Sequence, residues 1–225
     1  MQPLRATIRT HTLEPLGKPA LTLAFSEAIT LGAGQFVLAH LPGSNAALRT
    51  RLFPVQISND GFTCDHIPDP AWLPGRVVEV LGPLGKPFSP PHMTSHWLML
   101  SLGVHPERLL PLLESGRVQS ASMAFWSEQI PPSLPSDVER PVELGEAIDW
   151  ADFIAIELPG PDWPERYLAL RSQLTLGKAA AVQALVDVPT PCGFGVCQAC
   201  AVPQRKGWSL GCQSGLVLSM EQIHG

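Results

Sequence analysis

Four cysteines near the end of the sequence are the residues best suited to chemistry. They are Cys192, Cys197, Cys200 and Cys212, and their spacing is C-x4-C-x2-C-x11-C. The first three follow the C-x4-C-x2-C pattern that holds plant-type [2Fe–2S] clusters. Glycines at positions 193 and 195 would let the backbone approach an inorganic core closely. We therefore predict that the four cysteines are ligands of a [2Fe–2S] cluster.

Two other interpretations of these cysteines stay open. One is a structural zinc site, although such sites usually combine two closely spaced cysteine pairs, whereas Cys212 stands alone. The other is a set of unrelated thiols. A fifth cysteine, Cys64, lies far away in the sequence, and we interpret it as a buried, inert thiol. The sequence offers no Ser/His/Asp or Cys/His arrangement, so no catalytic residue is predicted.

Composition and charge narrow the class of protein. The 225 residues are 45% hydrophobic and 16% charged, which is typical of a globular chain. A net charge of −5 argues against nucleic acid or an anionic membrane as a partner. No stretch approaches the ~20 apolar residues of a membrane helix, and the first residues lack the apolar core of a signal peptide. We expect a cytoplasmic protein, where clustered cysteines indicate metal ligands rather than disulfides.

The first hundred residues have the pattern of short strands. Runs of β-forming residues at 6–10, 20–25, 35–40 and 76–81 are separated by glycine and proline. The chain has 24 prolines, which break helices and are poor within central strands, so many short elements are expected. This spacing predicts an antiparallel barrel or sandwich.

The pattern changes near residue 96. Apolar runs at 97–102, 121–126 and 153–156 are typical of strands buried on both faces. Helical spacing occurs at 106–115, between the first two runs, and at 163–174, after the third. This alternation of strands and helices predicts a small parallel α/β sheet. We interpret the proline-rich residues 131–141 as a surface loop, and residues 180–188 as a strand that leads into the cysteines.

Three motifs in the same order resemble one family. They are Gly34-Gln35-Phe36-Val37, the turn at 82–88 (GPLGKPF) and the cysteine segment at 191–200 (PCGFGVCQAC). They are similar to P-G-Q-F-V, G-P-L-G-x-x-F and P-C-G-x-G-x-C-Q-x-C of the dihydroorotate dehydrogenase electron-transfer subunits, in the ferredoxin reductase superfamily. The resemblance implies an FAD-binding β-barrel at 1–93, an NAD-binding-like α/β domain at 94–180 and a [2Fe–2S] module at 181–225.

The resemblance also places the nucleotide sites. The family's flavin motif R-P-x-S falls on Phe53 and the candidate FAD residues Pro54, Val55 and Gln56. Phenylalanine and glutamine in place of arginine and serine argue against FAD, although Arg51 lies on the same side of an extended strand and could substitute. The family's nucleotide loop falls on 101–106, where only Gly103 of the G-G-G-x-G pattern remains. We therefore do not expect NAD to bind.

The function that the resemblance implies is electron transfer. We expect an oxidoreductase subunit that relays electrons through a [2Fe–2S] cluster, to or from a flavoprotein subunit of the dihydroorotate dehydrogenase type, in a hetero-oligomer serving pyrimidine biosynthesis. NADH oxidation by the chain alone is not expected. Two alternatives remain: a cluster-bearing scaffold or redox sensor with inactive nucleotide sites, and a zinc-stapled structural module.

Overall fold

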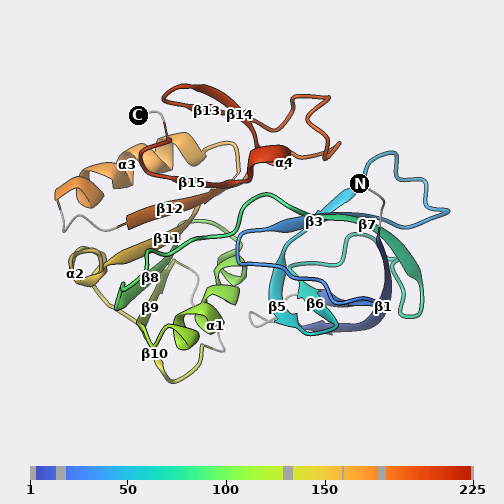
Figure 1. Ribbon diagram of the computed structural model, residues 1–225, viewed down its shortest axis with the longest axis horizontal. Coiled ribbons are helices and arrows are strands. Elements are labelled where there is room, and N and C mark those ends of the chain that lie inside the picture. Colours follow the sequence, from blue (N-terminus) through green and yellow to red (C-terminus); the bar gives the residue numbers. More distant parts are fainter. Residues whose placement is uncertain (1–3, 14–18, 129–133, 159, 177–180, 224–225) are drawn as a thin grey trace.

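The computed structural model describes residues 4–13, 19–128, 134–158, 160–176 and 181–223. Figure 1 shows two bodies side by side, a curled sheet built from the first part of the chain and an α/β sheet built from the rest. The last segment of the chain, in orange and red, returns across the top of the α/β sheet toward the curled sheet.

The first body is a seven-stranded antiparallel sheet with the order β4-β3-β7-β1-β2-β6-β5. Phe53 alone separates β4 from β5, the two strands at opposite ends of this order, so the chain itself closes the sheet into a barrel. Side chains that alternate along the strands fill the interior, among them Ile8, Leu23 and Val80. The strands are β1 (Leu4–Leu13), β2 (Pro19–Phe25), β3 (Phe36–His40), β4 (Thr50–Leu52), β5 (Pro54–Ser58), β6 (Gly61–Cys64) and β7 (Val77–Leu84).

The second body is a six-stranded sheet with the order β10-β9-β8-β11-β12-β15. Its first five strands are parallel and β15 is antiparallel to β12. The order reverses between β8 and β11, which makes their carboxyl ends a topological switch point. The strands are β8 (His96–Ser101), β9 (Ser122–Ser127), β10 (Val138–Glu139), β11 (Phe153–Leu158), β12 (Ala181–Val186) and β15 (Val217–Ser219).

Helices cover both faces of this sheet. The 3₁₀ helix η1 (Pro106–Leu109) and helix α1 (Pro111–Val118) contact β5 of the barrel, so they form the junction between the two bodies. Helices α2 (Leu144–Trp150) and α3 (Trp163–Leu176) contact each other away from the barrel (Figure 1). Among the residues that the structure describes, no helix is long and apolar enough to span a bilayer.

The last segment combines a hairpin, a single helical turn and the edge strand of the α/β sheet. The hairpin is β13 (Ala201–Gln204) with β14 (Gly207–Leu210), and α4 (Gly211–Ser214) follows directly. Both β12 and β15 lie in the α/β sheet, although the sequence motifs assign 181–225 to a separate module. The division of the chain into three domains stays a prediction, but its third part shares a sheet with the second.

Most expected strands and helices are confirmed within one to three residues. Strands β4 to β6, helix α2, the hairpin and the edge strand β15 were not predicted. The proline-rich segment, expected as a loop, contains the two-residue strand β10, which pairs with β9. Pro131 and Pro132 of that segment lie outside the described residues.

Candidate functional site

The four C-terminal cysteines come together in two pairs. The Sγ atoms of Cys192 and Cys197 lie 3.2 Å apart, and those of Cys200 and Cys212 also lie 3.2 Å apart. The first three belong to the loop that follows β12, and Cys212 is supplied by α4. The amide of Gly211 donates a hydrogen bond to the Cys200 carbonyl at 2.8 Å, which holds α4 against the loop.

The distances within the two pairs are too long for disulfides and shorter than those between two ligands of one metal ion. A disulfide joins its sulfurs at about 2.05 Å, and all five cysteines are free thiols. Two thiolates on one tetrahedral ion, with metal–sulfur bonds of about 2.3 Å, lie about 3.8 Å apart. Among the described residues, no group of three or more His, Cys, Asp or Glu side chains is arranged as for a metal ion. Four thiols are the number of ligands that a [2Fe–2S] cluster needs, two for each iron.

Glycine is required in the cysteine loop for two reasons. Gly193 and Gly195 have φ angles of 75° and 78°, a left-handed conformation that other residues rarely adopt. A Cβ atom at Gly193 would lie 2.6 Å from Cδ1 of Leu38 in the barrel, and one at Gly195 would lie 2.6 Å from Nε2 of Gln213. The loop is thus pressed against both the barrel and α4.

The two pairs differ in their surroundings. Backbone N–H groups of Cys197 and Phe194 point at the Cys192 sulfur and lower the pKa of that thiol to about 6. Burial, followed by the neighbouring Cys200, raises the pKa of Cys212 to about 12. Cys200 and Cys212 are buried, whereas Cys197 is exposed and Cys192 is half-buried. One end of the site therefore faces solvent and the other faces the protein interior.

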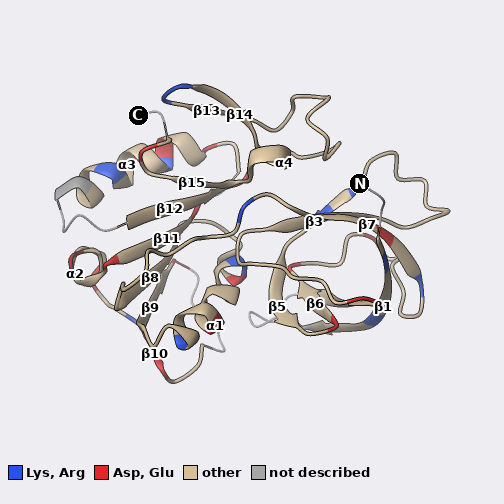
Figure 2. Cartoon of the chain, in the orientation of Figure 1, with Lys and Arg blue, Asp and Glu red and all other residues tan. Residues whose placement is uncertain are grey.

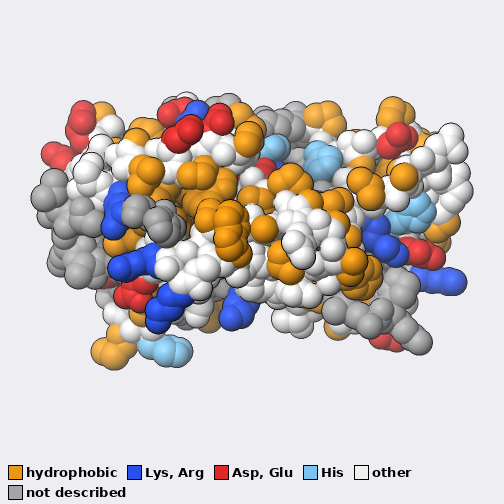
Figure 3. Space-filling view, turned by 90° about the horizontal axis from the view of Figure 1, so that it is seen from above, with side chains coloured by type: hydrophobic (Ala, Val, Ile, Leu, Met, Phe, Trp, Pro, Cys, Tyr) orange, Lys and Arg blue, Asp and Glu red, His pale blue; other side chains and the backbone are white. Residues whose placement is uncertain are grey.

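The surface around the exposed pair is uncharged and partly apolar. Residues 188–204 contain no Lys, Arg, Asp or Glu, as the tan loop at the upper right of Figure 2 shows. Phe194 and Val196, which lie between the first two cysteines, are 51% and 82% exposed. Figure 3 looks down on this side of the molecule, and hydrophobic side chains gather across its middle while charged side chains lie mostly toward its ends.

The candidate FAD residues lie where the barrel meets the α/β sheet. Val55 and Gln56 line a cleft of about 860 Å³ between β5, α1 and the loop 28–33. Pro54 is buried beside them in β5. The cleft is large enough for a flavin ring system, since small-molecule sites occupy about 300–1,000 Å³.

The residue at the motif's arginine position, Phe53, is part of a buried ionic cluster. The Arg108 guanidinium lies over the Phe53 ring, with Cζ 4.3 Å from the ring centroid. Its Nε donates to Asp65 Oδ2 at 3.0 Å, and its Nη1 donates to Asp187 Oδ2 at 3.1 Å. Burial disfavours the charged forms of Asp65 and Arg108, but their ion pairs outweigh this effect. The pKa of Asp65 therefore falls well below its usual range, and the pKa of Arg108 rises.

Arg51, the expected substitute for the missing arginine, is engaged elsewhere. Its guanidinium donates to Asp187 Oδ1 and to the carbonyl of Val188, in the segment that leads to the cysteines. The cluster thus joins the barrel, η1 and the end of β12. Sequence reasoning missed Arg108 and Asp187; the available signal was a charged residue within apolar sequence, as in Val186-Asp187-Val188.

A carboxylate occupies the switch point of the α/β sheet. Ser101 Oγ donates to Glu157 Oε2 at 2.7 Å, and a Cβ atom at Gly103 would lie 2.4 Å from both Glu157 carboxylate oxygens. Burial raises the pKa of Glu157, because nearby Ser101 and Arg108 only partly offset it. This negative group lies beside the one glycine that remains of the expected nucleotide loop. Whether NAD binds stays a prediction.

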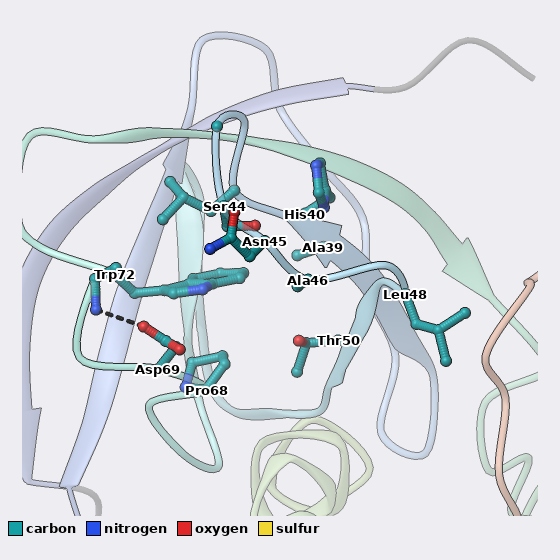
Figure 4. A pocket seen from close by; sticks show the side chains of 13 residues that line it. Ala39, His40, Ser44, Asn45, Ala46, Leu48, Thr50, Pro68, Asp69 and Trp72 are labelled. Atoms are coloured by element: carbon teal, nitrogen blue, oxygen red, sulfur yellow. Dashed lines mark hydrogen bonds between the residues drawn. The ribbon is translucent and has the colours of Figure 1, made fainter.

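A further cavity of about 510 Å³ lies at one end of the barrel (Figure 4). Ser44 and Asn45 lie over one face of the Trp72 ring, and Pro68 and Asp69 lie on the other side. Trp72 itself is 4% exposed, so its ring serves mainly as part of the barrel core.

No protein-family model matches the sequence, and no curated protein matches it significantly. Several solved structures have a similar fold. The NADH-dependent reduced ferredoxin-NADP oxidoreductase, studied for flavin-based electron bifurcation, aligns over 97% of this chain and 89% of its own, with a TM-score of 0.72 and 14% identity. Phthalate dioxygenase reductase, a modular structure for electron transfer from pyridine nucleotides to [2Fe–2S], aligns over 99% and 96%, with a TM-score of 0.61 and 11% identity. The flavohem-like FAD/NAD-binding domain of nitric oxide dioxygenase from Vibrio cholerae O1 biovar El Tor aligns over 84% and 100%, with a TM-score of 0.57 and 13% identity.

These likenesses establish a ferredoxin-reductase-like fold, with an antiparallel barrel followed by a parallel α/β sheet. They do not single out the dihydroorotate dehydrogenase subunit, so that resemblance stays a prediction, as does the C-terminal cluster module. Our interpretation that FAD is possible but doubtful is not borne out by them, since their number includes an FAD/NAD-binding domain.

Proposed function

We propose that this chain is an iron–sulfur electron-transfer protein that holds a [2Fe–2S] cluster on Cys192, Cys197, Cys200 and Cys212. The observation that carries the proposal is the arrangement of the four thiols in two pairs, each 3.2 Å wide, on a glycine-containing loop and the adjoining helical turn. When bound, such a cluster accepts and returns a single electron. The chain's part is to hold the thiolates and to direct N–H groups toward their sulfurs.

The proposed partner is a flavoprotein, as in the family that the sequence motifs resemble. The exposed end of the site, at Cys192 and Cys197, is the end that a partner could approach. Phe194 and Val196 beside it, in a stretch without charged residues, would suit an apolar contact. A dihydroorotate-oxidising subunit is the specific partner that we propose from the motif resemblance.

FAD is the second cofactor that we propose to look for. The cleft along Val55 and Gln56 lies at the junction between the barrel and α1, and its volume of about 860 Å³ would admit a flavin. Val55 and Gln56 would contact the flavin from the strand that carries the serine in the family's R-P-x-S motif.

A specific observation favours a second candidate function, a cluster-bearing scaffold or redox sensor without nucleotides. Phe53, Arg108 and Asp65 form a buried group beside the cleft, at the position where the family's motif has its pyrophosphate-binding arginine. Glu157 places a carboxylate beneath the expected nucleotide loop. Both groups would have to move or be neutralised for a dinucleotide to bind as the motifs imply.

The deciding experiment is chemical analysis of the protein purified without oxygen. Iron, acid-labile sulfide, zinc and flavin are quantified on one sample, together with its visible absorption spectrum. We expect about two irons and two sulfides per chain, because four thiolates complete one [2Fe–2S] cluster. One FAD per chain in addition would support a reductase subunit, and no flavin would support the scaffold.

A matched pair of variants tests the ligand assignment. Cys197→Ser should abolish cluster assembly, whereas Cys64→Ala should leave iron and sulfide unchanged, because Cys64 lies in the barrel core. Full iron and sulfide content in Cys197→Ser would refute the assignment. Zinc without iron or sulfide would replace the proposal with a zinc-stapled structural module.

A further inference from the structure

The side chain of Gln213 connects the two pairs of cysteines. Gln213 directly follows Cys212 of the buried pair, in α4 at the base of the cysteine loop (Figure 1). Its Nε2 donates a hydrogen bond of 3.0 Å to the carbonyl oxygen of Phe194, which lies between Cys192 and Cys197 of the exposed pair. A residue that adjoins one pair therefore holds the backbone that carries the other.

The amide of Gln213 also packs directly against the loop. A Cβ atom at Gly195 would lie 2.6 Å from Nε2 and 2.8 Å from Cδ of Gln213, and 3.0 Å from Cδ1 of Leu210. Only glycine at position 195 leaves room for this amide. Gln213 is exposed to solvent, so this contact and the hydrogen bond, rather than burial, fix the position of its amide.

The carbonyl that Gln213 holds belongs to the same peptide unit as the Gly195 N–H. A peptide unit is planar, and in its trans form the C=O and N–H bonds point in opposite directions. The Phe194–Gly195 peptide is trans. On the side away from Gln213, the Gly195 N–H donates a hydrogen bond to the sulfur of Cys212. The orientation of one peptide plane therefore links the Gln213 amide to a cysteine sulfur.

We propose that Gln213 is a positioning residue that raises the reduction potential of the cluster, by holding the Gly195 N–H toward the Cys212 sulfur. The inference rests on the proposed function, since it concerns a [2Fe–2S] cluster on the four cysteines. Reduction adds negative charge to such a cluster, and N–H groups that donate to its sulfurs stabilise that charge.

The peptide needs an external hold because glycine itself provides none. Gly195 has no Cβ atom, so it opposes rotation of the adjoining peptide plane less than any other residue would. Without the donor on Gln213, the Phe194 carbonyl is free to turn toward water. The Gly195 N–H turns with it, and its hydrogen bond to the Cys212 sulfur weakens.

The test is a redox titration of the full-length protein purified without oxygen, followed by its visible spectrum and by electron paramagnetic resonance of the reduced cluster. Gln213→Met keeps the length of the side chain and removes its N–H donors. Gln213→Lys keeps a donor that can reach the Phe194 carbonyl. Gln204→Met and Gln204→Lys are the matched controls, because Gln204 Nε2 donates to Ser209 Oγ at 2.6 Å within the hairpin rather than to the cysteine loop.

We expect Gln213→Met to lower the equilibrium constant for cluster reduction about fivefold, the effect of weakening one hydrogen bond. Because a tenfold change corresponds to about 59 mV for one electron, the midpoint potential should fall by about 40 mV. Gln204→Met should leave the potential unchanged. Gln213→Lys should keep the natural potential once the effect of the added charge, which Gln204→Lys measures, is subtracted.

An unchanged potential in Gln213→Met, or an equal fall in Gln204→Met, would overturn the proposal. Equal potentials in Gln213→Met and the charge-corrected Gln213→Lys would also overturn it, since the donor would then be irrelevant. If Gln213→Met assembles no cluster, a full cluster in Gln213→Lys supports the donor role, and its loss in both variants contradicts it.

Iron and acid-labile sulfide, quantified on every sample, separate this inference from the proposed function. Their absence from the protein of natural sequence would refute the proposed function, and this inference with it. A cluster whose potential does not respond to the donor at position 213 would refute the inference alone.

Discussion

Arg108 and Asp65 form a buried ion pair that joins the two bodies of the molecule. The Arg108 Nη2 atom lies 2.9 Å from Asp65 Oδ2, and the two side chains are 6% and 0% exposed. Arg108 comes from η1 of the α/β part, and Asp65 directly follows β6 of the barrel. Asp65 also accepts the backbone N–H of Phe53 at 3.2 Å, at the residue where the barrel closes.

Neutralising one member of this pair should destabilise the whole protein. Asp65→Asn leaves the Arg108 charge buried with Asp187 as its remaining carboxylate contact, so we expect the free energy of unfolding to fall by about 3 kcal/mol. Urea denaturation measures the change. Asp137→Asn is the control, because it breaks the exposed pair with Arg117, which solvent screens, and should have little effect on stability. Equal losses in both variants would contradict the buried character of the Arg108–Asp65 pair.

The same cluster predicts how stability depends on pH. Arg108 holds the pKa values of Asp65 and Asp187 below the ordinary aspartate value, against the effect of burial. An aspartate that titrates near pH ~3.9 when unfolded and lower when folded contributes its full stabilisation above that pH. The contribution is lost as the pH falls through the folded pKa. We therefore expect the free energy of unfolding to drop below about pH 4, and to drop less steeply in Asp65→Asn. Parallel profiles would show that this pair does not govern acid stability.

Glu157 should have the opposite effect. Burial raises its pKa above the unfolded value, so the group favours folding while protonated and loses that contribution as the pH rises through the folded pKa. Glu157→Gln removes the buried charge and keeps an acceptor for Ser101. We expect the free energy of unfolding to rise at pH 7 and to be unchanged at pH 4. The exposed residue Glu146, changed to Gln, is the control and should have little effect at either pH. A destabilised Glu157→Gln would mean that attraction to Arg108 outweighs burial.

Gly193 offers a test of the cysteine loop that leaves every thiol in place. Gly193→Ala is expected to reduce iron and sulfide content and to lower stability by about 3 kcal/mol, because the added Cβ meets Leu38 in a backbone conformation that already disfavours alanine. Gly43→Ala is the matched control, since Gly43 has a φ of 81° and nothing within 4 Å of the added Cβ. It should cost about 1–2 kcal/mol, with full cluster content. Similar effects in the two variants would show that the loop can shift away from the barrel.

Local sequence patterns were sufficient to predict the strands whose side chains are buried continuously or in regular alternation. The apolar runs at β8 and β11 are buried along almost their whole length. In β2, the apolar side chains of the alternating pattern lie on the face that packs in the barrel interior. Strands β4 and β5 escaped prediction because they are short and their residues alternate less regularly in burial. They owe their pairing to β3 and β6, which no local pattern of the two strands themselves encodes.

The candidate site was predictable only where its residues are close in the sequence. Spacing identified the three cysteines of the loop, and Cys212 was assigned as the fourth ligand because only eleven residues separate it from Cys200. The link between Asp65, Arg108 and Asp187 joins three segments far apart in the chain, so it depends on how the barrel and the sheet meet.

The two edges of the α/β sheet have a consequence for solubility. Strand β10 has two residues and β15 has three, and they flank longer strands that are rich in buried apolar side chains. Short edge strands offer few free backbone groups for pairing with another copy of the sheet. The segment that carries the cysteines ends in one of these strands, so it also shields β12 from edge-to-edge aggregation.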